Sequence, residues 1–317
     1  MAVFKSFRAY RPAKSNQSAI PALPYDVMSS EEAREMVKGN SLSFLHVDRA
    51  EIDFPIGTDM YNDAVYEKAK ENLLALENTG AMIQDETPCF YIYRQVMNGR
   101  AQVGLVGCAS IDDYMNNIIK KHEKTLAKKE QDRINHVNVT DANTGPIFLT
   151  YRKNSAINMT ISLWMNEKEP VYNFEADGVL QTIWVVDDTA VINRLSSLFK
   201  DVNYLYIADG HHRCASAIKV GQMRREAHPD YTGNEEFNFF LAVAFPDDEL
   251  EIMDYNRVVK DLNGMSSDEF LSRVFEKFEI KKEDSPYRPT ERHTFGMYLD
   301  KEWYSLKAKK SIIDEND

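Results

Sequence analysis

The chain has 317 residues, of which 43% are hydrophobic and 28% charged, the composition of an ordinary globular protein. This excludes the fibrous and disordered classes, and the length suits one large α/β domain or two smaller lobes. The 50 acidic residues outnumber the 38 basic ones and give a net charge of −12, so general attraction to nucleic-acid phosphates is unfavourable.

Hydropathy and cysteine spacing narrow the class further. No stretch reaches the roughly 20 apolar residues that cross a bilayer, and the first residues lack the apolar core of a secretory signal. We therefore expect a cytoplasmic protein without membrane contacts. Cys89, Cys108 and Cys214 have neither disulfide-type nor zinc-type spacing, which predicts three free, buried thiols.

The first part of the chain predicts two helices and then a hairpin. Ser29 or Ser30 can cap a helix after the Pro-punctuated opening, and the apolar spacing over residues 62–78 predicts another helix. Residues 90–96 and 101–108 flank Asn98-Gly99, a pair that readily takes the positive φ angles of a type I′ turn. These segments predict a β-hairpin.

Later segments predict buried strands separated by helices. Short apolar runs at residues 146–151, 183–187 and 239–245 suit such strands, and residues 294–307 predict a second hairpin. The whole pattern predicts an α/β fold with a mixed sheet.

The segment from Lys120 to Arg133 is locally basic, with six Lys or Arg residues against three acids. One interpretation is a basic patch that contacts phosphates. The other is a solvated helix with i,i+4 ion pairs such as Lys128 with Asp132. The sequence leaves both open.

The largest group of candidate functional side chains lies between a predicted strand at residues 204–208 and a predicted helix at residues 214–221. Gly221 is expected to end this helix. The intervening residues are Asp209, Gly210, His211, His212 and Arg213. Because a helix start offers unpaired N–H groups and the positive end of the helix dipole, anions bind there readily. The segment therefore predicts a ligand-binding or catalytic turn.

Each side chain of this turn suits phosphate chemistry. Arg213 offers a planar fork that matches phosphate oxygens, His211 and His212 can donate hydrogen bonds or move protons near neutral pH, and Gly210 permits close approach of a ligand. A metal held by Asp209 and the two histidines is a less favoured alternative, because adjacent side chains on a turn diverge.

These residues and five other segments resemble a bacterial and archaeal family, domain of unknown function 1015. The matching segments are residues 22–27 (ALPYDV), 44–47 (FLHV), 122–125 (HEKT), 132–133 (DR), 207–213 (IADGHHR) and 255–259 (YNRVV). Members of that family usually continue well beyond residue 317, so the resemblance implies that a C-terminal part is absent here.

Residues 183–221 are also similar, more distantly, to the ParB/sulfiredoxin superfamily, which includes free-serine kinases, CTP-binding partition proteins and sulfiredoxin. This similarity implies a ParB/sulfiredoxin-like core in residues 161–317 and an N-terminal, hairpin-containing α+β lobe in residues 1–160, the two forming one compact unit. It also implies that Arg213, in a Gly-x-x-Arg turn, holds a phosphoryl group with the helix N-terminus.

The resemblance favours a small-molecule phosphotransferase or phosphatase acting on serine, O-phosphoserine or a similar phosphorylated metabolite. A nucleotide or a phosphate compound would serve as donor or acceptor, and Mg²⁺ is a candidate cofactor. His122 and Glu123 would orient the acceptor or move protons with Asp209, His211 and His212. The further candidates are Lys124, Lys129 and Arg133 for phosphate, and Tyr25, Asp26 and Arg257 for substrate.

Two other functions remain open at this point. A nucleotide-responsive, ParB-like DNA-binding regulator would fit the superfamily, although the acidic charge and the lack of a basic recognition helix argue against nucleic acid as a partner. A metal-dependent hydrolase would need a His and carboxylate ligand set that spacing alone does not reveal. The sequence does not define the metal, the oligomeric state or the direction of transfer.

Overall fold

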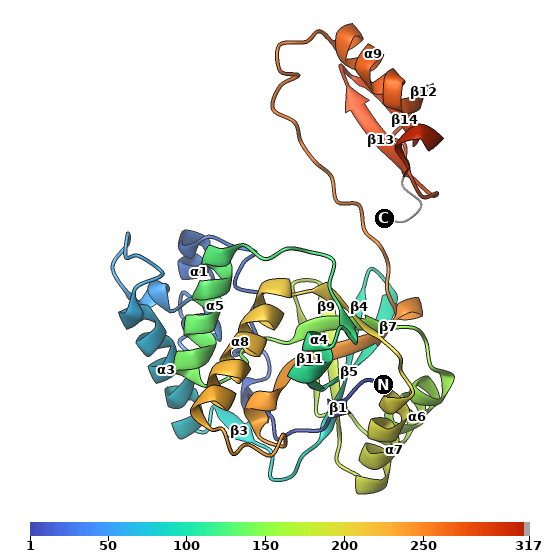
Figure 1. Cartoon of the computed structure of the whole chain (residues 1–317). Helices are drawn as coiled ribbons and strands as arrows, with labels where there is room; N and C mark the ends of the chain where they lie inside the picture. Colours follow the sequence, from blue (N-terminus) through green and yellow to red (C-terminus); the bar gives the residue numbers. More distant parts are fainter. Residues whose placement is uncertain (314–317) are drawn as a thin grey trace. The chain divides into compact units, whose positions relative to one another are not determined.

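The computed structural model describes residues 1–313 and shows a mixed α/β protein (Figure 1). The chain divides into two compact units at residues 251 and 252. We call residues 1–251 unit 1 and the described residues from 252 onward unit 2. The boundary expected after residue 160 falls inside a helix of unit 1, and strands from both sides of that position share one sheet.

Unit 1 is built on a mixed sheet with nine strands among the described residues, in the order β6-β10-β7-β11-β5-β4-β9-β8, with β1 paired to β5. The β6–β10 and β7–β11 pairs are parallel, and the other pairs are antiparallel. A small separate sheet joins β2 (Tyr10–Pro12) to β3 (Met82–Gln84). The strands of the main sheet are β1 (Phe4–Lys5), β4 (Phe90–Met97), β5 (Arg100–Ser110), β6 (Ile119–Lys120), β7 (Ile147–Tyr151), β8 (Tyr172–Ala176), β9 (Val179–Val186), β10 (Leu205–Asp209) and β11 (Phe239–Pro246).

Helices flank this sheet: in Figure 1, α3, α5 and α8 lie to the left of the strands, and α6 and α7 lie to the right. Among the described residues, none of the helices combines the length and the apolar character needed to span a membrane. The helices of unit 1 are α1 (Ser30–Met36), α2 (Leu45–Asp48), α3 (Asp63–Asn78), α4 (Ile111–Met115), α5 (Ala127–Thr140), α6 (Ser155–Glu167), α7 (Thr189–Lys200) and α8 (His211–Ala227), with 3₁₀ turns η1 (Lys14–Asn16), η2 (Ala50–Asp53), η3 (Glu236–Asn238) and η4 (Asp247–Glu249).

Unit 2 contains helix α9 (Ser267–Lys277), a three-stranded sheet in the order β12-β14-β13, and the 3₁₀ turn η5 (Lys310–Ile312). Its strands are β12 (Phe278–Glu283), β13 (Thr294–Leu299) and β14 (Glu302–Ala308). Asp300 and Lys301 join β13 to β14 with φ angles of 50° and 66°, so the second predicted hairpin is confirmed.

Local turn and cap chemistry explains why the other predicted elements form. Asn98 and Gly99 have φ angles of 51° and 78°, and β4 and β5 pair on either side of them as expected. Ser29 closes a capping box with Glu32 at the start of α1, and Asn62 caps α3. The predicted strands at residues 146–151, 183–187 and 239–245 are confirmed as parts of β7, β9 and β11.

The main core lies within unit 1, where apolar residues of the sheet meet those of α6, α7 and α8. Phe90, Leu105, Tyr151 and Phe199 are among its largest fully buried side chains. Each such side chain contributes about 1.5–3 kcal/mol when it leaves water. The three cysteines are buried and free, as expected.

One local prediction is wrong, and one of two interpretations left open by the sequence is excluded. Gly221 does not end its helix, because α8 continues to Ala227; a Cβ at Gly221 would lie only 2.5 Å from the carbonyl oxygen of Phe237, so close packing explains this glycine. The segment from Lys120 to Arg133 is not one solvated helix, because residues 121–126 form a loop before α5 and Asp132 is buried, away from water.

Candidate functional site

Two neighbouring strand-to-helix units place the candidate site. Strands β6 and β10 run parallel, and each leads into a helix, β6 through residues 121–126 into α5 and β10 through Gly210 into α8. Helices α5 and α8 pack side by side, and their first turns meet where the Leu126 N–H donates to Nε2 of His212 at 3.1 Å. Ligands of α/β proteins bind at such carboxyl ends of parallel strands.

Both helices begin without a capping side chain among the described residues. By contrast, α1, α3, α4, α6, α7 and α9 all receive a side-chain hydrogen bond at the start. The first turn of α5 carries Lys128 and Lys129 together with the acidic Glu130, and the first turn of α8 carries Arg213. The start of a helix is itself electropositive, so two such starts at one place favour an anion.

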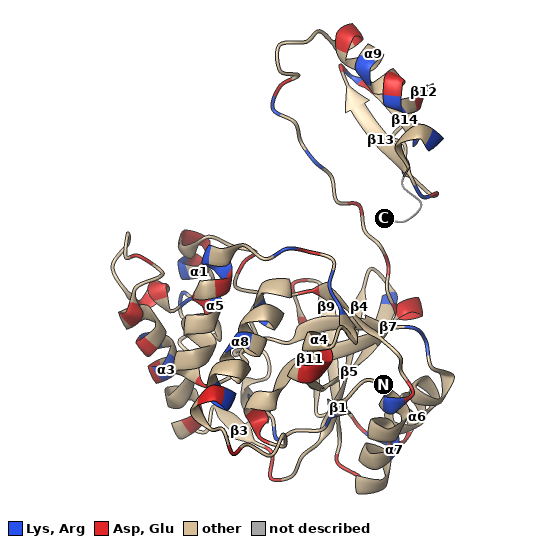
Figure 2. Cartoon of the chain, in the orientation of Figure 1, with Lys and Arg blue, Asp and Glu red and all other residues tan. Residues whose placement is uncertain are grey.

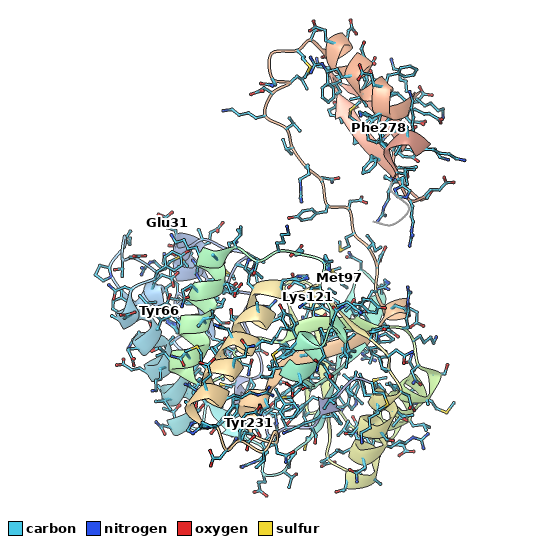
Figure 3. All side chains as sticks on the ribbon, viewed as in Figure 1. Glu31, Tyr66, Met97, Lys121, Tyr231 and Phe278 are labelled. Atoms are coloured by element: carbon cyan, nitrogen blue, oxygen red, sulfur yellow. The ribbon has the colours of Figure 1, made fainter. Side chains whose placement is uncertain are left out.

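A compact group of His122, Glu123 and His211 lies at this junction, and Figure 3 marks Lys121 at the start of the loop that carries two of them. Nδ1 of His211 lies 3.3 Å from Oε2 of Glu123, and the rings of His122 and His211 meet edge to face with centroids 4.4 Å apart. His122 and Glu123 are exposed, whereas His211 is only 5% exposed. His122 and Glu123 belong to the loop before α5, whereas His211 is the first residue of α8.

The two adjacent histidines of α8 have different environments. Burial lowers the pKa of His211 and the neighbouring His122 lowers it further, while Glu123 opposes the shift, so His211 favours the neutral form. His212 turns toward α5, where its Nε2 accepts the Leu126 N–H and must therefore be unprotonated. His211 thus faces the group of ionisable side chains, and His212 positions the two helix starts.

Arg213 holds the turn together. Its guanidinium donates to the Asp209 carboxylate at 2.8 Å and to the Pro146 carbonyl at 2.7 Å. A Cβ at Gly145 or Gly210 would lie 3.3 or 3.2 Å from guanidinium atoms, and Gly210 has a φ of 90°, so both glycines leave room for this side chain. The guanidinium of Arg213 therefore already makes two hydrogen bonds within the protein. The predicted phosphate contact would use its remaining N–H donors.

A buried polar network lies under the start of α5. Arg133 pairs with Asp132 at 2.7 Å, and the hydroxyl of Tyr66, labelled on α3 in Figure 3, donates to the same carboxylate at 2.9 Å. The Arg133 guanidinium lies 4.1 Å from the ring centroid of Tyr25. Burial raises the pKa of Tyr25 while Arg133 opposes the shift, and Arg213 is close enough to contribute in the same direction as Arg133.

The structure therefore brings together most of the predicted site residues but not all in the expected roles. Lys124 lies exposed in the loop before α5, Lys129 lies exposed in its first turn, and Asp26 is exposed next to the half-buried Tyr25. Arg257 belongs to unit 2, where its guanidinium lies 3.9 Å from the ring centroid of Tyr255, and its place relative to the turn is not defined.

Sequence reasoning missed several groups that shape this site. Leu126 supplies an N–H to His212, Pro146 supplies a carbonyl to Arg213, and Tyr66 satisfies Asp132. The first two act through the backbone and have no side-chain signature, whereas a tyrosine on the apolar side of α3 was a detectable signal. Figure 2 shows acidic and basic residues interspersed over α1 and α3.

The structure defines a mixed α/β protein in which two helices begin side by side after the parallel strands β6 and β10. A family model described as "Protein of unknown function (DUF1015)" matches residues 4–316, and the chain belongs to that family. Searches among curated proteins and among solved structures find no match.

Proposed function

We propose that the protein is a small-molecule phosphotransferase or phosphatase that binds a phosphoryl group where α5 and α8 begin. The observation that carries this proposal is the meeting of two uncapped helix starts with basic first turns. Unpaired N–H groups and aligned helix dipoles bind phosphate in many proteins. Two such starts at one point favour a doubly negative group over a neutral ligand.

The surrounding side chains can serve the transfer itself. Glu123 is an exposed carboxylate beside the neutral imidazole of His211, so this pair can accept a proton from an attacking hydroxyl or water. Lys124 and the free donors of Arg213 can stabilise charge on the migrating phosphoryl group. Phosphoryl transfer needs both kinds of group, and they occur here within one loop and one helix turn.

Serine and O-phosphoserine are the first substrates to test, because the similarity to the ParB/sulfiredoxin superfamily points to free-serine kinases. Tyr25 and Asp26 follow the N-terminal proline turn and lie near Arg133, where they can contact the organic part of a substrate. The acidic net charge disfavours a nucleic-acid partner.

The test is phosphorus NMR on purified protein incubated with O-phosphoserine alone, or with serine and a nucleotide panel. We expect turnover, and we expect Glu123→Gln to lower kcat/KM by about 10²- to 10⁴-fold, the usual loss for a general base. Glu71→Gln is a matched control, since the side chains of Glu71 and Glu123 are 68% and 61% exposed. Absence of turnover with every substrate, or equal activity of both variants, would contradict the proposal.

A further inference from the structure

The group formed by His122, Glu123 and His211 has the composition of a metal centre. Each side chain offers one ligand atom, and these atoms lie within 4.8 Å of one another. His211 comes from the buried start of α8, while the other two come from the loop after β6, so two separate elements converge on one point. Convergence of ligands from different elements is how proteins fix coordination geometry.

Distances within the group suit a single small ion. With bonds of about 2.0–2.1 Å and tetrahedral angles, ligand atoms of zinc lie roughly 3.4 Å apart. Oε2 of Glu123 and Nδ1 of His211 are already 3.3 Å apart. The 4.8 Å limit for the whole group leaves a small movement of an exposed His122 or Glu123 side chain to complete the geometry.

The environment of His211 points the same way. This side chain is 5% exposed, and its Nε2 is buried without a hydrogen-bond partner among the described residues. Buried polar atoms normally have a partner, so an unpaired imidazole nitrogen in a native structure needs an explanation. No described residue pairs with Nε2, so the ring can keep its proton on Nε2 and present the lone pair of Nδ1 to an ion.

We propose that His122, Glu123 and His211 bind one divalent transition-metal ion of the zinc type. Two imidazoles and one carboxylate suit Zn²⁺ or Co²⁺, whereas Mg²⁺ prefers an all-oxygen shell with several waters. Three protein ligands leave at least one coordination position open, the arrangement of catalytic rather than structural zinc sites. An anion or a water could bind at this open position.

A Glu123 carboxylate bound to the ion would not act as the base of the proposed transfer, so the two proposals give Glu123 alternative roles. Metal binding is measured without any substrate, which tests this site apart from the phosphoryl transfer. The full-length chain is stripped with a chelator, dialysed and titrated with Co²⁺ and Zn²⁺, and metal content is measured by mass spectrometry. We expect about one ion per chain and a visible d–d absorption band of Co²⁺ that Zn²⁺ displaces. Mg²⁺ at equal concentration is expected to leave the band unchanged.

Variants assign the site to these residues. His122→Asn and Glu123→Gln change exposed side chains in the loop before α5, and each is expected to weaken Co²⁺ binding at least about 100-fold, beyond the loss typical of outer-shell substitutions. His211→Asn should do the same, with circular dichroism checking its fold. His228→Asn, at the other end of α8, is the matched control and should bind like the parent protein.

Two results would overturn the metal site: no Co²⁺ band in the parent protein, or a band of equal strength in all three variants. A retained band without phosphoryl turnover would reject only the proposed function. Turnover in metal-free protein with no Co²⁺ binding would reject only the metal site.

Discussion

Helices α5 and α8 differ from helices α6 and α7 in how they begin. Asn154 caps two N–H groups of α6, and Asp188 caps two of α7. The starts of α5 and α8 receive no side-chain cap among the described residues, although α8 follows a strand directly. The side chains of Asn154 and Asp188 thus satisfy donors at the starts of α6 and α7, whereas no described side chain does so for α5, α8 or the four-residue α2.

Helix α5 also differs from α6 and α7 in what it buries. Helix α6 buries Ile157, Thr160, Ile161 and Trp164, and α7 buries Leu195 and Phe199. Helix α5 instead buries a set that is mostly polar or ionisable: Asp132, Arg133, Ile134, His136 and Thr140. Buried charges and imidazoles cost free energy unless they are paired, and Asp132 and Arg133 meet this requirement by pairing with each other.

The largest effect is expected from removing one partner of the buried ion pair. Arg133→Met leaves the Asp132 carboxylate buried with only the Tyr66 hydroxyl, and we expect the free energy of unfolding to fall by about 3–5 kcal/mol. Urea denaturation measures this. Lys38→Met, which breaks an exposed pair with Glu35, should change stability by less than about 1 kcal/mol.

A double variant sharpens the interpretation. Replacing both partners, Asp132→Asn with Arg133→Met, removes the unpaired charge, so most of the lost stability should return. A double variant as unstable as Arg133→Met alone would mean that packing around the Arg133 stem, rather than the uncompensated carboxylate, causes the loss.

Removing the side-chain cap of α7 is expected to have an intermediate effect on stability. Asp188→Ala deletes the acceptor for two N–H groups of α7 and should lower the free energy of unfolding by about 1 kcal/mol. Phosphate binding at the α5–α8 junction, measured by calorimetry, should not change. A parallel loss of phosphate affinity would show that the two helix pairs are not independent.

Adding a side-chain cap to α5, one of the two helices at the candidate site, is the reciprocal experiment. Leu126 has the extended backbone of an N-cap residue and is 62% exposed, so Leu126→Asp can cap α5 without disturbing the core. We expect stability to rise by roughly 0.5–1 kcal/mol. We also expect phosphate affinity to fall about tenfold, since the new carboxylate occupies the donors and repels an anion. Unchanged phosphate affinity would argue against an anion site there.

Sequence chemistry predicted the parts of this fold that depend on neighbours along the chain. Asn98-Gly99 specified its hairpin, and Ser29 and Asn62 specified the starts of α1 and α3, because turns and caps are local. Gly221 misled the same reasoning, since its role is to let Phe237 approach α8 closely, a contact between elements.

The candidate site was predictable as a list of residues but not as a geometry. Strand β6 has only two residues, and its pairing with β10 joins segments more than eighty residues apart, so no local pattern revealed it. That pairing places Glu123 beside His211. The metal alternative weighed from sequence used Asp209 with both histidines, but Asp209 pairs with Arg213 and His212 turns toward Leu126.

The smallest expected effect tests how α5 tolerates a buried imidazole. His136 is 3% exposed, and its Nε2 lies 3.0 Å from the Val47 carbonyl. Burial lowers the pKa of His136 and Arg133 lowers it further, against smaller opposing effects of Asp48 and Asp132. The native imidazole therefore stays neutral while the unfolded one, with a pKa near roughly 6.5, takes up a proton.

Because the unfolded state binds more protons in this range, stability is present above the unfolded pKa and is lost as the pH falls below it. Between pH 7 and pH 6 we expect a contribution of less than about 1 kcal/mol. His136→Gln keeps a donor for Val47 but does not titrate, so its urea midpoint should depend less on pH over this interval. Two results would contradict this prediction: a parent protein whose stability rises between pH 7 and pH 6 on acidification, or a variant whose stability depends on pH as strongly as that of the parent. Either would mean that other groups dominate the pH dependence and that protonation of His136 does not affect the free energy of unfolding.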